Sequence, residues 1–308
     1  MHEIKIEEPP QLTGEQQQIT DLHSLLNVLN VIIGELSLIE DILPEANSSL
    51  FSTQATLDRL GQVFLSGKSP RGAVMELDGL CEPILSMIQD LESGCVGEAR
   101  DELRLSRTNL LSVFRVLKQR VIELDEPGRE AEQWTRLRID LFSERIVEVF
   151  RAIEKNARGR YGICFNLARC DTRDYYVDLK VESELGTEIF MPHRMQDVVR
   201  DLAANARKYT EPGGRVMIAV YQSRSALHCC IEDTGYGIPQ DELSRVVEFG
   251  YRASNVAHLK SCGGGLGLTK AAWFVHRWNG TMRIASQEGQ GTRIRFSVPN
   301  SAQIPVTR

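Results

Sequence analysis

The chain has 308 residues, with 36 basic and 42 acidic side chains, a formal net charge of -6, and 42% hydrophobic and 25% charged residues. This composition is that of an ordinary globular protein, and it excludes a disordered, collagen-like or disulfide-dense chain. The negative charge argues against a nucleic-acid binder that depends on a broad basic surface, and the length predicts two domains.

The sequence pattern predicts neither a signal peptide nor a membrane span. The start MHEIKIEEPP lacks the charged and then apolar layout of a signal peptide, and no apolar run approaches the roughly 18 residues that a bilayer span needs. We therefore expect a cytoplasmic protein. Its seven cysteines form no CxxC pair, which predicts reduced, mostly structural thiols rather than a zinc or redox site.

Residues 15–43 have the clearest helical periodicity, and Pro44 ends this predicted helix. Its apolar residues recur in alternating steps of three and four, as in a heptad seam. They are Leu22, Leu25, Leu29, Ile32, Leu36, Ile39 and Leu43. A second seam runs over 98–125. Because two narrow seams bury too little surface alone, we expect these helices to pair as a hairpin, and two copies to form a four-helix bundle.

The segment 44–97 separates the two seams and is predicted to be a helical insertion. Helices are expected at about 49–66 and 76–94, with a turn at 67–72, where glycine and proline cluster. Acidic residues dominate 76–102, which we interpret as a solvated helix face rather than an acidic docking surface.

After Pro127 and Gly128 the pattern changes to mixed helices and strands. Strands are predicted at about 175–182, 215–221, 226–232, 281–286 and 292–298. Helices are predicted at about 141–158, 193–209 and 267–278. Turn residues at 222–225 and 288–291 favour two hairpins. The fold class is therefore α+β, with helices on one face of a mixed sheet.

Three polar side chains on the helix predicted at 193–209 point to a metal and phosphate site. Asp201, Asn205 and Lys208 are four and then three residues apart, so they project from one face. A carboxylate, an amide oxygen and an ammonium suit a magnesium ion held among phosphate oxygens, because magnesium prefers hard oxygen ligands. Taken alone, the same residues also fit a polar helix surface.

Two glycine clusters follow. Asp233 ends a predicted strand and is followed by Gly235 and Gly237, so a carboxylate can accept a hydrogen bond from an exocyclic amine while the backbone approaches a flat ligand. The run from Gly263 through Gly267 leads into a predicted helix, where backbone amides can face phosphates. Neither cluster matches a P-loop or a GxGxxG dinucleotide loop, so a different nucleotide fold is required.

These stretches, in this order and spacing, resemble the N, G1, F, G2 and G3 boxes of sensor histidine kinases, within the wider superfamily of GHKL ATPases. They read DLAANARKYT from Asp201, DTGYGIP from Asp233, Phe249, GGGLGL from Gly263, and GQGT from Gly289. The resemblance covers about 130–300. It implies a helical dimerisation and histidine phosphotransfer domain over 1–128, then a two-layer α/β-sandwich (Bergerat) ATP-binding domain over 129–308.

The resemblance also implies a role for each matching residue. Asn205 would ligate Mg²⁺, Lys208 and Tyr209 would contact phosphate, Asp233 would recognise adenine, and about 248–266 would form the ATP lid. The remaining residues implied to bind ATP are Asp201, Gly235, Gly237, Gly263, Gly265, Leu266, Gly267 and Thr292. Asp201 is a departure, because kinases often carry Asn there while hydrolysing relatives use an acid.

The helix at 15–43 contains a stretch from His23 to Asn27 that resembles the kinase H-box. The resemblance implies that His23 accepts the phosphoryl group, since neutral imidazole is a nucleophile near pH 7. Asn27 lies one turn on, where a polar residue helps relatives to dephosphorylate their partner. Ser24 stands where the family usually has an acid that raises the nucleophilicity of the histidine.

The first functional hypothesis is an ATP-dependent protein histidine kinase of a two-component system. It would bind ATP and Mg²⁺, phosphorylate His23, pass the phosphate to a separate response regulator, and act as a homodimer without nucleic acid or membrane span. The second is a catalytically weak module that sequesters or dephosphorylates a signalling partner, which Ser24 favours. The third, an ATPase that couples hydrolysis to conformational work, draws support from Asp201.

Overall fold

The computed structural model describes residues 1–17, 20, 28, 32, 35–40, 42–43, 70–124, 134–157, 159–259 and 264–300. The chain divides into two compact units, one of Met1–Thr20 with Glu130–Arg308 and the other of Asp21–Arg129. The helix predicted at 49–66 lies outside the described residues. No helix among the described residues is long and apolar enough to cross a membrane.

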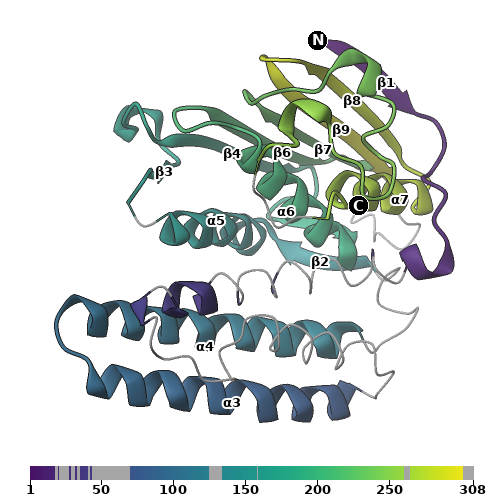
Figure 1. Ribbon diagram of the computed structural model, residues 1–308. Helices are drawn as coiled ribbons and strands as arrows, with labels where there is room; N and C mark the ends of the chain where they lie inside the picture. Colours follow the sequence, from purple (N-terminus) through teal and green to yellow (C-terminus); the bar gives the residue numbers. More distant parts are fainter. Residues whose placement is uncertain are drawn as a thin grey trace. The chain divides into compact units, whose positions relative to one another are not determined.

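The helical unit contains two long helices, α3 (Pro70–Gly94) and α4 (Glu98–Leu124), that lie side by side as a hairpin (Figure 1). The helix predicted at 98–125 is confirmed as α4. The helix predicted at about 76–94 is α3, which begins earlier than predicted, at Pro70. Proline is tolerated in the first turn of a helix, because the amide that it lacks would have no partner within the helix there. Glu92 near the end of α3 accepts hydrogen bonds from Arg104 and Arg107 of α4, each at 3.0 Å.

One apolar core joins three segments of this unit. It contains Ile32, Leu36 and Ile39 from the predicted seam, Leu77, Cys81, Ile84 and Ile88 from α3, and Leu103, Leu110, Phe114 and Leu117 from α4. Within the predicted helical insertion 44–97, the structure describes α3, which contributes to this core. Of the described seam residues, Ile32, Leu36 and Ile39 are buried in this core, and Leu43 packs partly buried against it.

The larger unit is built on a mixed seven-stranded sheet in the order β1-β8-β9-β7-β6-β4-β3. Its strands are β1 (His2–Ile6), β3 (Ile163–Cys164), β4 (Tyr175–Ser183), β6 (Arg215–Gln222), β7 (Ala226–Asp233), β8 (Thr281–Gln287) and β9 (Gly291–Pro299). The pairs β3·β4 and β4·β6 are parallel and the others antiparallel. All five predicted strands and both hairpins are confirmed.

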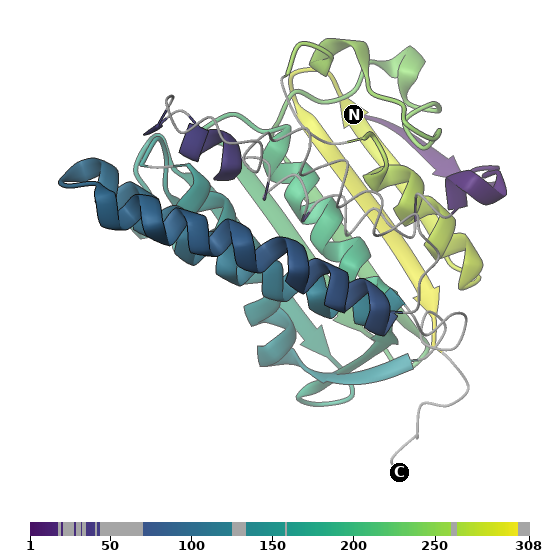
Figure 2. The same cartoon turned by 60° about the horizontal axis from the view of Figure 1, so that its bottom comes forward.

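Three helices cover one face of this sheet, namely α5 (Ile139–Asn156), α6 (His193–Lys208) and α7 (Gly267–Arg277) (Figure 1 and Figure 2). Alternate residues of β6, Val216, Ile218 and Val220, are buried in the core that the helices share with the sheet. Burial of each such side chain contributes about 1.5–3 kcal/mol. The α+β prediction with helices on one face is confirmed.

The short strands were not predicted from the sequence. Two of them, β2 (Trp134–Arg138) and β5 (Glu188–Pro192), form a separate two-stranded sheet. The first residues, expected in the helical domain 1–128, form β1, which pairs along its whole length with β8 of the larger unit. This pairing forms because β8 would otherwise leave the backbone amides and carbonyls of its edge without partners. β1 supplies those partners, and its Ile6 becomes buried.

The prediction of reduced thiols is wrong for one pair, because Cys164 and Cys170 form a disulfide. A single turn of 3-10 helix, η1 (Leu167–Arg169), brings the chain back after β3, so that the two Cα atoms lie 5.7 Å apart. That separation is ordinary for a disulfide. Cys81, Cys95, Cys229 and Cys230 are free.

Candidate functional site

Asp233 is a buried carboxylate at the end of β7, where two predicted glycine motifs meet. Its Oδ1 accepts hydrogen bonds from the backbone amides of Gly235, at 2.9 Å, and of Thr292 on β9, at 3.3 Å. Burial raises the pKa of Asp233 to about 7, although both amide hydrogen bonds act in the opposite direction. The structure thus brings three predicted site residues together around one acceptor.

The loop after Asp233 packs so closely that it requires glycine. A Cβ at Gly235 would lie 2.0 Å from the Tyr209 carbonyl oxygen, to which the next amide, that of Tyr236, donates at 3.0 Å. Gly237 has a φ of +65°, and a Cβ there would lie 2.0 Å from the Gln287 carbonyl oxygen. The glycines therefore allow contact between backbone segments and hold the loop against the end of α6.

Helices α6 and α7 meet at two predicted site residues of α6. A Cβ at Gly267, the first residue of α7, would lie 2.2 Å from Asn205 Nδ2, so glycine makes room for the Asn205 amide. One turn earlier on α6, Asp201 Oδ2 accepts a hydrogen bond from Lys270 Nζ at 2.7 Å. The predicted N and G2 motifs are thus in direct contact.

Lys208 and Tyr209 lie at the end of α6. The Lys208 ammonium lies 5.1 Å from the centroid of the Tyr209 ring. Burial raises the pKa of Tyr209, while the charge of Arg252, a residue of the predicted lid, acts in the opposite direction. Beside this end of α6, the Tyr236 hydroxyl of the loop after Asp233 donates a hydrogen bond to Glu211 Oε1 at 3.0 Å.

The two ends of the predicted lid, 248–266, meet at its base. Gly265 has a φ of +71°, and a Cβ there would lie 2.8 Å from both the Gly250 carbonyl carbon and the Tyr251 carbonyl oxygen. Leu266 is buried, and its carbonyl accepts the first helical hydrogen bond of α7 from Lys270 N at 2.8 Å. The described parts of the lid are thus anchored at the start of α7.

Three predicted site residues, His23, Asn27 and Gly263, lie outside the described residues.

Two further residues of the candidate site were not predicted from the sequence. Ser286 on β8 accepts from the Ile238 amide and donates to the Gly291 carbonyl, each at 2.9 Å. The second such residue is Lys270, and the signal in the sequence was a charged side chain in the otherwise uncharged stretch 267–275 of α7.

The donor set fits a magnesium nucleotide. Asp233 offers a carboxylate for an exocyclic amine, and Asn205 offers an amide oxygen of the kind that Mg²⁺ accepts when phosphates supply its other ligands. Lys208 offers a positive charge one turn after Asn205. The elements that carry these groups are held together by the close glycine contacts, so the groups are preorganised rather than scattered over separate loops.

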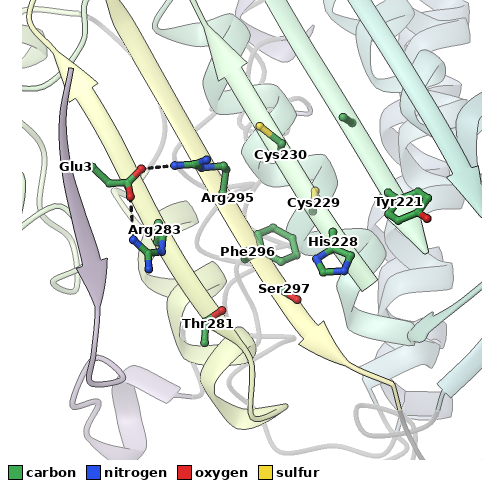
Figure 3. A pocket seen from close by; sticks show the side chains of 11 residues that line it. Glu3, Tyr221, His228, Cys229, Cys230, Thr281, Arg283, Arg295, Phe296 and Ser297 are labelled. Atoms are coloured by element: carbon green, nitrogen blue, oxygen red, sulfur yellow. Dashed lines mark hydrogen bonds and ion pairs between the residues drawn. The ribbon is translucent and has the colours of Figure 1, made fainter. Parts of the chain in front are cut away.

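A hollow of about 480 Å³ lies elsewhere, on the sheet face away from the helices (Figure 3). Tyr221 and His228 stack at one side with ring centroids 6.1 Å apart, and Glu3 pairs with Arg283 and Arg295 at the other. None of the predicted site residues lines it. The hollow is therefore separate from the candidate site.

Residues 191–302 match the family described as "Histidine kinase-, DNA gyrase B-, and HSP90-like ATPase". This match covers α6, both glycine motifs and β9, and so contains all the predicted nucleotide-binding residues.

Curated relatives are sensor kinases. The chain is 35% identical over 120 residues to the adaptive-response sensory kinase SasA of Synechococcus elongatus, covering 39% of this chain and 30% of SasA. It is 31% identical over 129 residues to the sensor histidine kinase WalK of Bacillus subtilis, covering 41% of this chain and 19% of WalK. The chain thus spans less than a third of the length of these two relatives.

Among solved structures, the mycobacterial sensor histidine kinase MprB aligns over 54% of this chain and 97% of its own, with 21% identity and a TM-score of 0.39.

Proposed function

Because residues 191–302 are an ATPase domain of the sensor histidine kinase type, we propose that the chain is an ATP-dependent protein histidine kinase. It phosphorylates its own His23 and passes the phosphoryl group to an aspartate of a separate response regulator. We place this activity in the cytoplasm, where ATP and such regulators are available.

The main support for this proposal is the burial of Asp233 and the hydrogen bonds that its carboxylate accepts. A carboxylate with an exposed fraction of 7% stands at the end of a strand, held by amides of two separate motifs. Ionised, it is a strong acceptor for the exocyclic amine of adenine. Burial of a charged group costs free energy, and a buried acid with a shifted pKa at the end of a strand is therefore a candidate for ligand binding.

The phosphate end of the nucleotide would lie toward α6. Asn205 would contribute its amide oxygen to the magnesium ion, and Lys208 with Tyr209 would contact phosphate oxygens. Mg-ATP, when bound, supplies the γ-phosphoryl group. The protein contributes mainly positioning and charge neutralisation, as phosphoryl transfer generally requires.

In the transfer step, an imidazole nitrogen of His23 forms a bond to the γ-phosphorus while the bond from that phosphorus to the β,γ-bridging oxygen breaks. ADP leaves, and phosphohistidine remains. We further propose that 21–129 is the dimerisation and phosphotransfer unit, that the chain acts as a homodimer, and that Asn27 supports dephosphorylation of the regulator.

Autophosphorylation of His23 can be measured with labelled ATP. We expect the purified chain, incubated with magnesium and γ-labelled ATP, to acquire a label that is lost in acid and stable in base. His23→Gln should abolish the label by removing the acceptor. Asn205→Ala should reduce it by at least about tenfold, because one oxygen ligand of the metal is lost. The measurement is the label retained on the protein after acid or base treatment.

An equal label in His23→Gln would contradict His23 as the acceptor. If ATP binds and no phosphoprotein forms in the parent chain, the kinase proposal is wrong. The sequestering or dephosphorylating module, which Ser24 favours, would then be the function to test.

A further inference from the structure

Lys270 is a charged residue with no exposed surface in the middle of the candidate site. Its exposed fraction is 0%, and its Nζ lies 2.7 Å from Asp201 Oδ2, whose side chain is 14% exposed. Removing one partner of a buried ion pair is costly, because a charge then remains in a poorly solvated place. Lys270 and Asp201 therefore act as one unit.

This ion pair lies beside the contact that holds Asn205. Asp201 and Asn205 are four residues apart on α6, while Gly267 and Lys270 are three residues apart on α7. Both spacings place the residues on one face of a helix. The first turn of α7 therefore meets α6 at two successive points, Asn205 with Gly267 and Asp201 with Lys270.

We propose that Lys270 is a positioning residue that makes Asp201 a fixed counter-charge rather than a base for water. It thereby directs the nucleotide toward phosphoryl transfer and away from hydrolysis. This inference rests on the proposed function of the site.

Hydrolysis with Asp201 as base would proceed as follows. A water oxygen forms a bond to the γ-phosphorus, the bond from that phosphorus to the β,γ-bridging oxygen breaks, ADP leaves, and the water proton goes to the Asp201 carboxylate. Once protonated, Asp201 no longer balances the buried ammonium of Lys270, so the proton transfer is opposed. Transfer to His23 needs no proton acceptor at position 201, because the nucleophile is an imidazole nitrogen.

The test uses the His23→Gln background, in which no phosphohistidine can form, and measures release of inorganic phosphate from Mg-ATP together with binding of ADP. The decisive variant is Lys270→Gln, because glutamine still donates a hydrogen bond to Asp201 but carries no charge. We expect phosphate release to rise by about tenfold or more, since general bases contribute factors of this size or larger. ADP affinity should stay within about threefold of the parent.

The matched control is Asp201→Asn combined with Lys270→Gln, which removes both charges. Its phosphate release, measured at saturating Mg-ATP, should fall well below that of Lys270→Gln, because no carboxylate remains to accept the proton. No rise in Lys270→Gln with ADP binding retained would overturn the proposal. Loss of ADP binding in Lys270→Gln that the double variant restores would show a purely structural role, and would overturn it too.

These readouts do not depend on His23. If the parent chain binds ADP but never acquires a label on His23, the proposed kinase function fails by itself, and the effect of Lys270 on hydrolysis is still decided by phosphate release.

Discussion

Burial and hydrogen bonding act in opposite directions on the carboxyl group of Asp233. Burial is the larger effect and raises its pKa from the ordinary 3.8 to about 7. Because the pKa of Asp233 is higher in the folded than in the unfolded state, protonation of Asp233 stabilises the folded state. This contribution to the free energy of unfolding is fully present below pH 3.8 and is lost as the pH rises through 7. Asp233 is therefore ionised at some cost in stability, as a residue kept for binding would be.

We predict from this that ADP binding weakens as the pH falls from 8 to 6, because protonation of Asp233 removes its charge as an acceptor. Asp233→Asn should lower the affinity at pH 8 by about tenfold or more, since hydrogen bonds to charged groups contribute about 1.5–3 kcal/mol. It should also remove most of the pH dependence. Calorimetric titration of both proteins at several pH values measures this, and parallel pH profiles would contradict the role of Asp233.

Among the elements, β1 shows how a short strand depends on its neighbour. Polar and apolar side chains alternate from Glu3 to Ile6, which is a strand pattern, but four residues carry too little signal to predict a strand. The edge of β8 supplies the missing hydrogen bonds, and His276 on α7 lies with Nε2 3.0 Å from the Ile6 carbonyl oxygen. Pairing rather than intrinsic propensity therefore decides this strand.

Ile6→Ala tests whether β1 contributes to the stability of the larger unit. Ile6 is 6% exposed, so its truncation should lower the free energy of unfolding by about 2 kcal/mol, the lower end of the range for buried isoleucine, because β1 lies at an edge. Lys5→Ala on the same strand is the control, since Lys5 is exposed and surface changes usually stay within about 0.5 kcal/mol. Urea denaturation measures the free energy of unfolding of both variants. An equally small loss in Ile6→Ala and Lys5→Ala would show that β1 does not stabilise the larger unit.

At the scale of the whole molecule, the helical unit lies in the chain between two parts of the larger unit, since Met1–Thr20 and Glu130–Arg308 pack together. The described seam residues, such as Leu36, share a core with α3 and α4 of the same chain. A heptad seam therefore does not by itself specify a homodimer here, because any helix with a complementary apolar face can cover it.

We predict that Leu110→Ala, at a fully buried position of this core, lowers the free energy of unfolding of the helical unit by about 2–5 kcal/mol. At a fixed protein concentration, Leu110→Ala should also lower the thermal midpoint of the helical unit, and an unchanged midpoint would contradict the place of Leu110 in this core. Homodimerisation itself is tested separately, by the mass in light scattering at micromolar concentration, where a monomer would contradict it.

Strong periodicity within single segments was enough to predict the α+β class, the helices α4 to α7 and five of the strands. Motif order was enough to predict that Asp233, Gly235 and Thr292 lie together. Features that depend on partners far apart in the chain required the tertiary structure. The strand β1 and the Asp201–Lys270 pair each depend on a second, distant segment, and residue spacing within one segment contains no information on which distant segment will lie beside it. The disulfide is local, since Cys164 and Cys170 are six residues apart, but their spacing alone does not show that η1 turns the chain back between them.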